Sequence, residues 1–179
     1  MKKHFLITLF IFSFSTFAQS KIMTRSGVIV FEASVPAFEE VKAKNQVVSC
    51  VLRPKTGEIA CLALVKGFRF KVALMEEHFN ENYAESDRFR KATFKGRLEG
   101  FDFKSISETA KEFVVSGQLE FHGKTNDVKT TAFVRKINED IEILVNFSLL
   151  ASDFDIKIPS LVKNKVTNKV NLKCEFLLK

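Results

Sequence analysis

The stretch that decides the fold class is KEFVVSGQLEF, residues 111–121. From Phe113 to Phe121 every odd-numbered position is apolar or glycine, whereas residues 116, 118 and 120 are polar. A period of two residues is typical of a β-strand with one buried face. The polar motif HGKTN, residues 122–126, indicates a turn, and an apolar-rich strand pattern returns at 128–137. The stretch therefore predicts two antiparallel strands.

Similar strand patterns extend over most of the chain. Further strands are predicted at 28–35, 46–53, 58–66, 92–101, 141–150 and 167–178, and short helical segments at 75–83 and 161–164. Regularly spaced strands with few helices favour a β-sandwich or a β-barrel. We expect an all-β fold, a single antiparallel barrel of about eight strands with one or two short helices. Such a barrel can hold one small ligand, whereas a sandwich packs shut.

A tight turn fixes the register of one predicted hairpin. PKTG, residues 54–57, separates the strands 46–53 and 58–66 and sets Arg53 opposite Glu58. In this register Cys50 lies directly opposite Cys61, at a separation that allows a disulfide in an antiparallel pair. We predict this disulfide, with Cys174 left reduced. The alternative is two small buried thiols in the sheet.

The N-terminus has the pattern of a signal peptide. Lys2 and Lys3 precede an apolar run at 5–17, which is too short to cross a bilayer, and small residues follow. We predict cleavage after Ala18, so that 1–18 is a signal peptide and 19–179 a single domain, periplasmic or secreted. An uncleaved anchor or a buried helix is the alternative. No second apolar run is long enough to span a membrane, so we expect no transmembrane span in the mature chain.

Composition argues against several classes of function. The formal net charge is +7, but its densest lysines, at 163, 165, 169 and 173, are spread over eleven residues. Nucleic-acid sites usually need clustered cations, so solvated strand faces are the better interpretation. The motifs of nucleotide, zinc and hydrolase sites are not found, and we expect no cofactor, no metal and no enzymatic activity. The chain has 20 Phe, one Tyr and no Trp, which suits a dry core or an apolar cavity.

Four stretches carry a resemblance to a known family. They are FRF with LMEEHFNENY and ESD (68–70, 74–83 and 85–87), ATFKG (92–96), SGQLEFHGKT (116–125) and SDFDI (152–156). Over roughly 27–178 the chain resembles the YceI-like family, a lipocalin-like group of exported polyisoprenoid-binding proteins. It departs from the family in having Arg90 and Lys91 where a proline is common, and in its pair of cysteines.

The resemblance implies an elongated apolar tunnel inside the barrel, which would hold a polyisoprenoid or another long-chain amphiphile. The residues expected to line its lumen are Phe68, Phe70, Leu74, Phe79, Phe94, Leu98, Phe113, Leu119, Phe121, Phe147 and Phe176. For each of them, ordinary core packing is the alternative. Residues 68–83 are expected to form one end of the tunnel, with His78, Asn80 and Asn82 as polar groups at its mouth.

The hypothesis from sequence is therefore an exported lipid- or isoprenoid-binding protein that carries or stores an amphiphile. One alternative is a solid-cored envelope β protein that acts through surface interactions, without a ligand. A weaker alternative is an enzyme or metal site built on His78, which would meet Glu81 on a helix. A hydrogen-bonded structural role for His78 is the simpler interpretation.

Overall fold

The computed structural model describes residues 21–35 and 40–179. The predicted signal peptide and its cleavage site lie outside the described residues. The strands are β1 (Ile22–Ser34), β2 (Lys42–Leu52), β3 (Glu58–Leu64), β4 (Arg69–Phe70), β5 (Lys91–Leu98), β6 (Lys111–Phe121), β7 (Lys124–Ile137), β8 (Asp140–Leu150) and β9 (Val166–Leu178). The helical segments are η1 (Val65–Gly67), α1 (Ala73–His78), η2 (Phe79–Tyr83), η3 (Phe103–Ser105), η4 (Ala151–Phe154) and η5 (Ser160–Val162).

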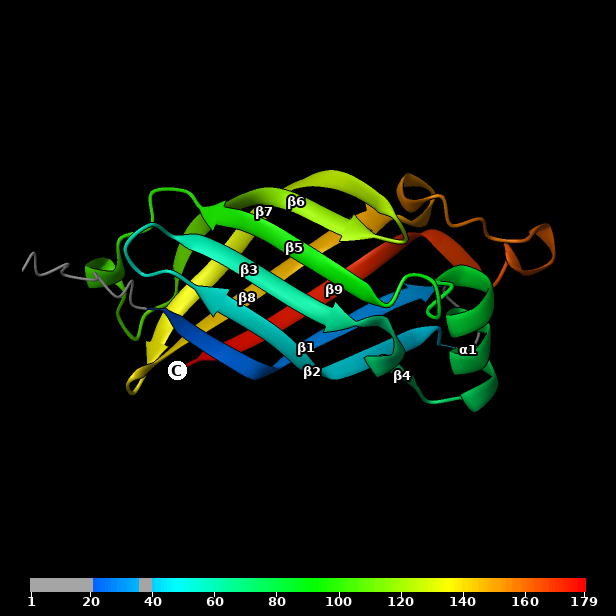
Figure 1. The fold of residues 1–179 in the computed structure, drawn as a ribbon, viewed down its shortest axis with the longest axis horizontal. Helices are drawn as coiled ribbons and strands as arrows, with labels where there is room; N and C mark the ends of the chain where they lie inside the picture. Colours follow the sequence, from blue (N-terminus) through cyan, green and yellow to red (C-terminus); the bar gives the residue numbers. More distant parts are fainter. Residues whose placement is uncertain (1–20, 36–39) are drawn as a thin grey trace, which may run out of the picture.

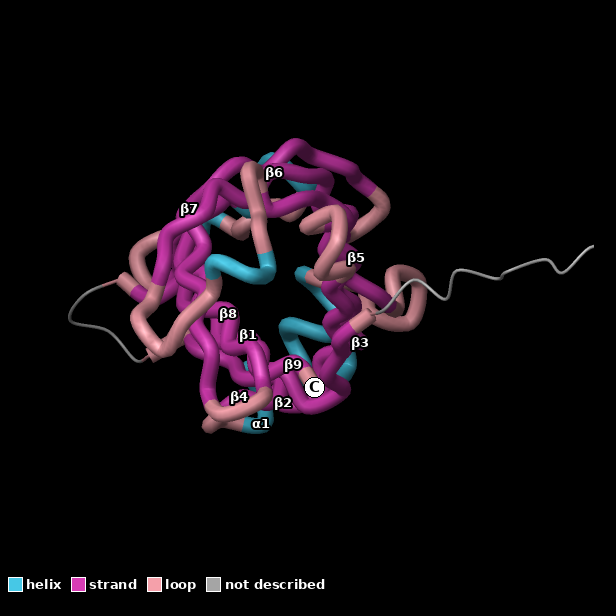
Figure 2. The backbone as a smooth tube through the Cα atoms, turned by 90° about the vertical axis from the view of Figure 1, so that its left-hand side faces the viewer, coloured by secondary structure: helices cyan, strands magenta, loops and turns pink. Residues whose placement is uncertain are grey.

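Eight antiparallel strands close into a barrel. Their order is β1-β9-β8-β7-β6-β5-β3-β2, and a further β1–β2 pairing closes the ring, while the two residues of β4 pair with the free part of β2 (Figure 1). Seen along the barrel, the strands form a ring (Figure 2). The all-β antiparallel barrel predicted from the sequence is confirmed. Several strands extend beyond the predicted bounds, since β1 begins at Ile22 and β2 at Lys42.

On the edge away from β1, β2 has two partners in succession, because it continues past the end of β3. Its residues 49–52 pair with β3, and its residues 43–44 pair with β4. Between these pairings, the fully buried side chain of Asn45 donates from Nδ2 to the backbone carbonyl oxygen of Leu64 at 3.0 Å, and its Oδ1 accepts from the backbone N–H of Val47. The Asn45 amide thus satisfies backbone groups where the chain leaves the sheet.

A two-residue turn joins β6 to β7. Phe121 and Lys124 are paired, and the two residues between them, His122 and Gly123, both have positive φ, 49° and 74°. Two positive φ values are the signature of a type I′ turn, whose twist matches that of an antiparallel hairpin. The polar motif at 122–126 therefore contributes a tighter turn than the sequence pattern indicates, and β7 begins at Lys124.

Two glycines face each other on the inner side of β5 and β6. Gly96 is paired with Gly117. A methyl group on Gly117 would lie 2.3 Å from the carbonyl oxygen of Lys95, and one on Gly96 would lie 2.7 Å from the ring of Phe94. The strands therefore approach closely here, and the ring of Phe94 lies over Gly96. Glycines at such places let a sheet bend into a barrel.

The two ends of the barrel differ. One end carries the turns β2–β3 and β7–β8 and the segment with η3; the other carries α1, η2, η4 and η5 (Figure 1). At the first end the interior is packed solid by buried side chains from six strands: Leu52, Leu98, Phe113, Val134, Ile141, Ile143 and Leu178. Phe101 and Ile106, from the segment around η3, pack against this core. We call this end the closed end, and the other the α1 end.

Candidate functional site: an apolar cavity in the barrel

A cavity of about 450 Å³ occupies the barrel from its middle to the α1 end. It is bounded by the inner faces of the strands, by α1 and η2, and by the segment that runs from η4 to β9. The lining residues are Ile29, Phe31, Ala33, Val41, Ile59, Cys61, Ala63, Phe68, Phe70, Met75, His78, Phe79, Tyr83, Ala92, Phe94, Val115, Leu119, Phe121, Val128, Thr130, Val145, Phe147, Leu149, Ala151, Phe154, Ile156, Ile158, Val162, Lys165, Val166, Thr167, Val170, Leu172, Cys174 and Phe176. Nine of them are phenylalanines.

Buried side chains from four strands form the floor of the cavity. Ile59, Val115, Val145 and Phe176 line the cavity and also belong to the buried core cluster that contains Leu98 and Phe113. The closed-end core residues Leu98, Phe113 and Ile143 do not line the cavity. The cavity is therefore a blind pocket whose depth is set by this layer.

An aromatic cluster forms one wall near the α1 end. The rings of Phe31, Phe68, Phe70 and Phe79 come from β1, the β3–β4 connection, β4 and η2. Phe31 lies 5.3 Å from Phe68, 5.7 Å from Phe70 and 5.3 Å from Phe79, measured between ring centroids. Tilted and edge-on rings at these separations attract each other beyond simple area burial. The cluster thus joins the helical segment to the sheet through the same side chains that line the cavity.

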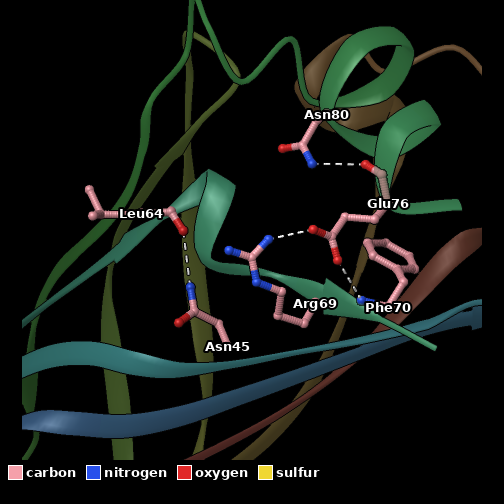
Figure 3. Close-up of polar contacts among 6 residues, drawn as sticks. All are labelled: Asn45, Leu64, Arg69, Phe70, Glu76 and Asn80. Carbon is pink, nitrogen blue, oxygen red and sulfur yellow. Dashed lines mark hydrogen bonds and ion pairs between the residues drawn. The ribbon is translucent and has the colours of Figure 1, made fainter. Parts of the chain in front are cut away.

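Polar contacts hold α1 in place against β4 (Figure 3). One carboxylate oxygen of Glu76 accepts from the backbone N–H of Phe70 at 3.1 Å, and the other pairs with the guanidinium of Arg69. Asn80 donates from Nδ2 to the carbonyl oxygen of Glu76 at 2.8 Å. These bonds fix the approach of the helix, so Phe79, one turn after Glu76, is directed into the cavity.

A histidine fixes the opposite side of the α1 end. His122 Nδ1 donates to the backbone carbonyl oxygen of Phe154 at 2.8 Å, and its Nε2 lies 3.3 Å from a carboxylate oxygen of Glu85. Its ring packs against Phe89 at 4.5 Å. Because Phe154 lines the cavity and is 1% exposed, these contacts join the β6–β7 turn, the segment after η2 and η4 around the end of the lumen.

Of the residues expected in the lumen, most line the cavity: Phe68, Phe70, Phe79, Phe94, Leu119, Phe121, Phe147 and Phe176. Three do not, and these placements are corrections. Leu98 and Phe113 are buried below the floor in the closed-end core, because they lie two residues further along the same inner faces. Leu74 is 57% exposed, because the Glu76 anchor turns that side of α1 to solvent.

The expected polar mouth is also only partly formed by the residues named for it. His78 lines the cavity, whereas Asn80 and Asn82 do not. Asn80 makes its hydrogen bonds to neighbouring backbone instead. Its side chain donates to the carbonyl oxygen of Glu76, as described above, and its own backbone carbonyl oxygen accepts from the N–H of Ser86. In the part of the chain that the structure describes, His78 makes no side-chain hydrogen bond, so the structural role expected for it is not observed, and no pair with Glu81 forms.

Sequence reasoning missed the segment between η4 and β9. Phe154, Ile156, Ile158 and Val162 line the cavity although they belong to no strand. Phe154, Ile156 and Ile158 alternate with a period of two, but this run is short and Pro159 ends it, so the sequence predicts no strand there. Phe31 was also missed as a lining residue; its place in a predicted strand was a signal that could have found it.

The cysteines occupy the wall near the floor. Cys50 and Cys61 are direct partners in the β2–β3 register and form a disulfide, with Cα atoms 4.1 Å apart. Cys50 is fully buried in the core and Cys61 lines the cavity. Cys174 is a buried free thiol on the cavity wall, and burial, with a smaller contribution from Glu175, raises its pKa to about 12.

Few polar groups face the lumen. Lys165 is the one lysine, arginine or carboxylate residue among the lining residues of the described chain, and His78, Tyr83 and Thr167 lie at the same α1 end. Across residues 21–35 and 40–179, no group of three or more His, Cys, Asp or Glu side chains could hold a metal ion. None of the helices described has the length and apolar character needed to cross a membrane. The cavity is thus apolar along its length and polar at one end.

Comparison with known proteins gives a consistent result. A family model described as a YceI-like domain matches residues 15–177. Sequence comparison with curated proteins gave no match. A structure described as a polyisoprenoid binding domain from Saccharophagus degradans, implicated in plant cell wall breakdown, superposes with a TM-score of 0.76 at 13% identity, covering 89% of this chain and 97% of that one.

Two further solved structures share the fold. BcnA of Burkholderia cenocepacia gives a TM-score of 0.69 at 14% identity, covering 84% of this chain and 95% of that one. A YceI protein of Campylobacter jejuni gives 0.53 at 12% identity, covering 100% and 91%. These likenesses extend over nearly the whole barrel, and the family model covers most of the sequence. The chain belongs to the YceI-like domain family.

Proposed function

We propose that the protein is an exported binding protein that carries or stores a long-chain amphiphile, such as a polyisoprenoid, in the barrel lumen. The observation that carries this proposal is the apolar cavity of about 450 Å³, lined by nine phenylalanines and by aliphatic side chains. Its volume falls within the range of small-molecule sites, about 300–1,000 Å³. A ligand chain without polar groups gains roughly 25 cal/mol for each Å² of apolar surface that it buries there, less the cost of ordering.

The distribution of polar groups supports an orientation for the ligand. His78, Tyr83 and Lys165 line the cavity at the α1 end, while the floor is apolar. A polar head group would leave its hydrogen bonds unmade at the floor, which costs free energy. We infer that the apolar chain points to the floor and the head group to the α1 end.

Relatives support the same class of ligand. The Saccharophagus degradans structure is described as a polyisoprenoid binding domain, and this chain shares its fold. At 13% identity the likeness concerns the fold, so the identity of the ligand rests on the cavity itself. The cavity also speaks against the solid-cored alternative. For lack of a nucleophile–base pair or a metal cluster among the described residues, we propose a binding role rather than an enzymatic one.

Export is part of the proposal. We propose that residues 1–18 are removed and that the mature chain, 19–179, is periplasmic or secreted. The disulfide between Cys50 and Cys61 supports an oxidising compartment. Sequencing the N-terminus of protein from the producing cell tests this step, and a mature chain beginning at Met1 would contradict it.

Organic extraction of natively purified protein, followed by mass spectrometry, tests the ligand. We expect one class of long-chain lipid at close to one molecule per protein. Protein that is repeatedly empty, although folded and purified without detergent, would contradict the carrier function.

A matched pair of substitutions tests where the lipid lies. Phe79→Asp places a charge in the aromatic wall and should abolish lipid retention, because a desolvated carboxylate is costly. Leu74→Asp, five residues earlier in the same helical segment, introduces the same charge at a position that is 57% exposed, so it should retain the lipid.

A third variant separates ligand loss from unfolding. Ala92→Trp adds apolar volume to the lumen from β5 without adding charge, and it should also reduce retention while the far-ultraviolet circular dichroism stays that of a β-barrel. If folded Phe79→Asp and Ala92→Trp proteins both copurify with as much lipid as the parent, the lumen is not the binding site.

A further inference from the structure

The segment 156–165, between η4 and β9, has two faces with different character. Ile156, Ile158 and Val162 line the cavity. Leu161, between them, is 88% exposed, and no other large apolar side chain in the described chain exceeds 61%. Singly exposed leucines are common on protein surfaces, but this one belongs to the segment that forms the cavity wall at the end of the lumen.

The charged residues of the segment itself all have one sign. Lys157, Lys163 and Lys165 belong to the same segment, and the sequence from 156 to 174 contains no acidic residue. The nearest carboxylate before it, Asp155, is paired with Lys124 at 2.7 Å. In the described part of the chain no ion pair involves these three lysines. They thus present positive charge that is not held in an ion pair within the described residues.

The opposite rim of the same end carries charges of both signs. α1 and η2 contain Glu76, Glu77 and Glu81, and the adjoining segments contain Arg69, which pairs with Glu76, and the exposed Lys71. A negatively charged surface would therefore be attracted more strongly to the 156–165 side, which has only cations, than to the α1 side, where the charges offset one another. This asymmetry favours one approach, in which the segment faces the surface and the lumen end lies next to it.

We propose that the segment 156–165 docks the protein on an anionic phospholipid surface, with Leu161 inserted at the boundary of head groups and acyl chains and the lysines against the phosphates. An apolar side chain flanked by cations is the combination that binds peripheral proteins to such membranes. The segment is continuous with the cavity wall, so a lipid leaving the bilayer would pass from the surface along Ile158 and Val162 into the lumen. This inference rests on the proposed carrier function and adds to it the surface from which the ligand is exchanged.

Flotation of the purified protein with vesicles tests the docking. We expect binding to vesicles of phosphatidylglycerol and phosphatidylethanolamine at 1:3, weaker binding at 0.5 M salt, and little binding to vesicles of phosphatidylcholine alone. Each lysine near an anionic surface contributes about a fivefold increase in partitioning. The double variant Lys157→Gln with Lys163→Gln should therefore lower partitioning about 25-fold, and Leu161→Ser about tenfold. Lys165 is left unchanged because it also lines the cavity.

Matched controls lie at the closed end. Lys55→Gln with Lys104→Gln removes two exposed lysines from loops there, and Leu177→Ser removes a leucine that is 39% exposed on β9. Both should change partitioning by less than twofold. If the parent fails to bind anionic vesicles, or the control variants lose as much binding as the segment variants, the docking proposal is overturned and the segment is left as a surface for some other partner.

Lipid extracted from the same preparations separates this proposal from the carrier function. Segment variants that keep their bound lipid but no longer float support docking by 156–165. A parent that floats through this segment but contains no lipid upholds the docking surface and overturns the carrier function. A parent that contains lipid but does not float upholds the carrier function and overturns the docking surface.

Discussion

The closed end and the α1 end of the barrel are built by the same strands with the same alternation, yet one is solid and the other hollow. On β6, Phe113 lies in the solid core and Phe121 lines the cavity, although both belong to one inner face. At the closed end the segment around η3 adds the ring of Phe101, whose centroid lies 5.4 Å from that of Phe113, so this segment helps to fill the barrel interior. At the α1 end the covering segments stand at the rim and leave the middle empty.

The difference teaches that alternation specifies which face of a strand points inward, and that the covering segments decide whether the interior is filled. A wall phenylalanine beside a cavity has neighbours on one side only, so it gains less dispersion energy than one in a closed core. The hollow end is therefore expected to contribute less to stability, and the closed end to hold the barrel together.

The largest effect is expected from Phe113→Ala, which removes a ring from the solid core. It should lower the free energy of unfolding by about 3–5 kcal/mol. Phe147→Ala, on the cavity wall, should cost about 1–2 kcal/mol in lipid-free protein, since its ring has fewer neighbours. Urea titrations of both variants and of the parent measure the two losses. Equal losses would mean that the two ends are packed alike, which would contradict the expected difference in stability between them.

A smaller effect is expected from the disulfide, which joins β2 to β3 where the wall changes from core to cavity. Replacing Cys50 and Cys61 together by alanine should cost about 2–3 kcal/mol, because the closed loop is short. Thiol counting on unfolded, unreduced protein should find one free thiol, that of Cys174. A count of three would show that the bond does not form in the cell.

The smallest expected effect is a pH-dependent loss of stability caused by the buried thiol of Cys174. Its folded pKa of about 12 lies above the unfolded value near 9, so from about pH 9 to 12 the unfolded chain binds fewer protons and stability falls as pH rises. Relative to Cys174→Ala, the parent should lose about 1 kcal/mol between pH 8 and pH 10. Urea titrations of both proteins at the two pH values give this difference. A constant difference would mean that the thiol ionises in the folded protein and that water reaches this wall.

The sequence was sufficient for the fold and for the inner faces of several strands. The alternation in β6, β8 and β9 assigns the inward residues correctly, because a one-residue slip would expose a whole apolar set. The turn at 54–57 sets the register that brings Cys50 and Cys61 together. These features are local, so short stretches of sequence contain them.

The extent of the cavity could not be predicted in the same way. Whether Phe113 or Phe121 meets a void depends on side chains that arrive from other strands and loops, which no single segment encodes. The exposure of Leu74 depends on the bonds of Glu76 to Phe70 and Arg69, and the lining by Phe154 on the bond from His122. Such long-range contacts leave no periodic signal in the sequence.

The facing glycines of β5 and β6 keep one layer of the barrel interior free of side chains. Gly96 and Gly117 lie one step above Val115, a floor residue, and neither position accepts a side chain without moving the backbone. Mutation at this step therefore cannot gradually fill the lumen, as it could at an ordinary inward position. The depth available to the proposed ligand would therefore have to change at the floor itself, at Val115 or Val145, where removing or adding a methylene group alters that depth only slightly.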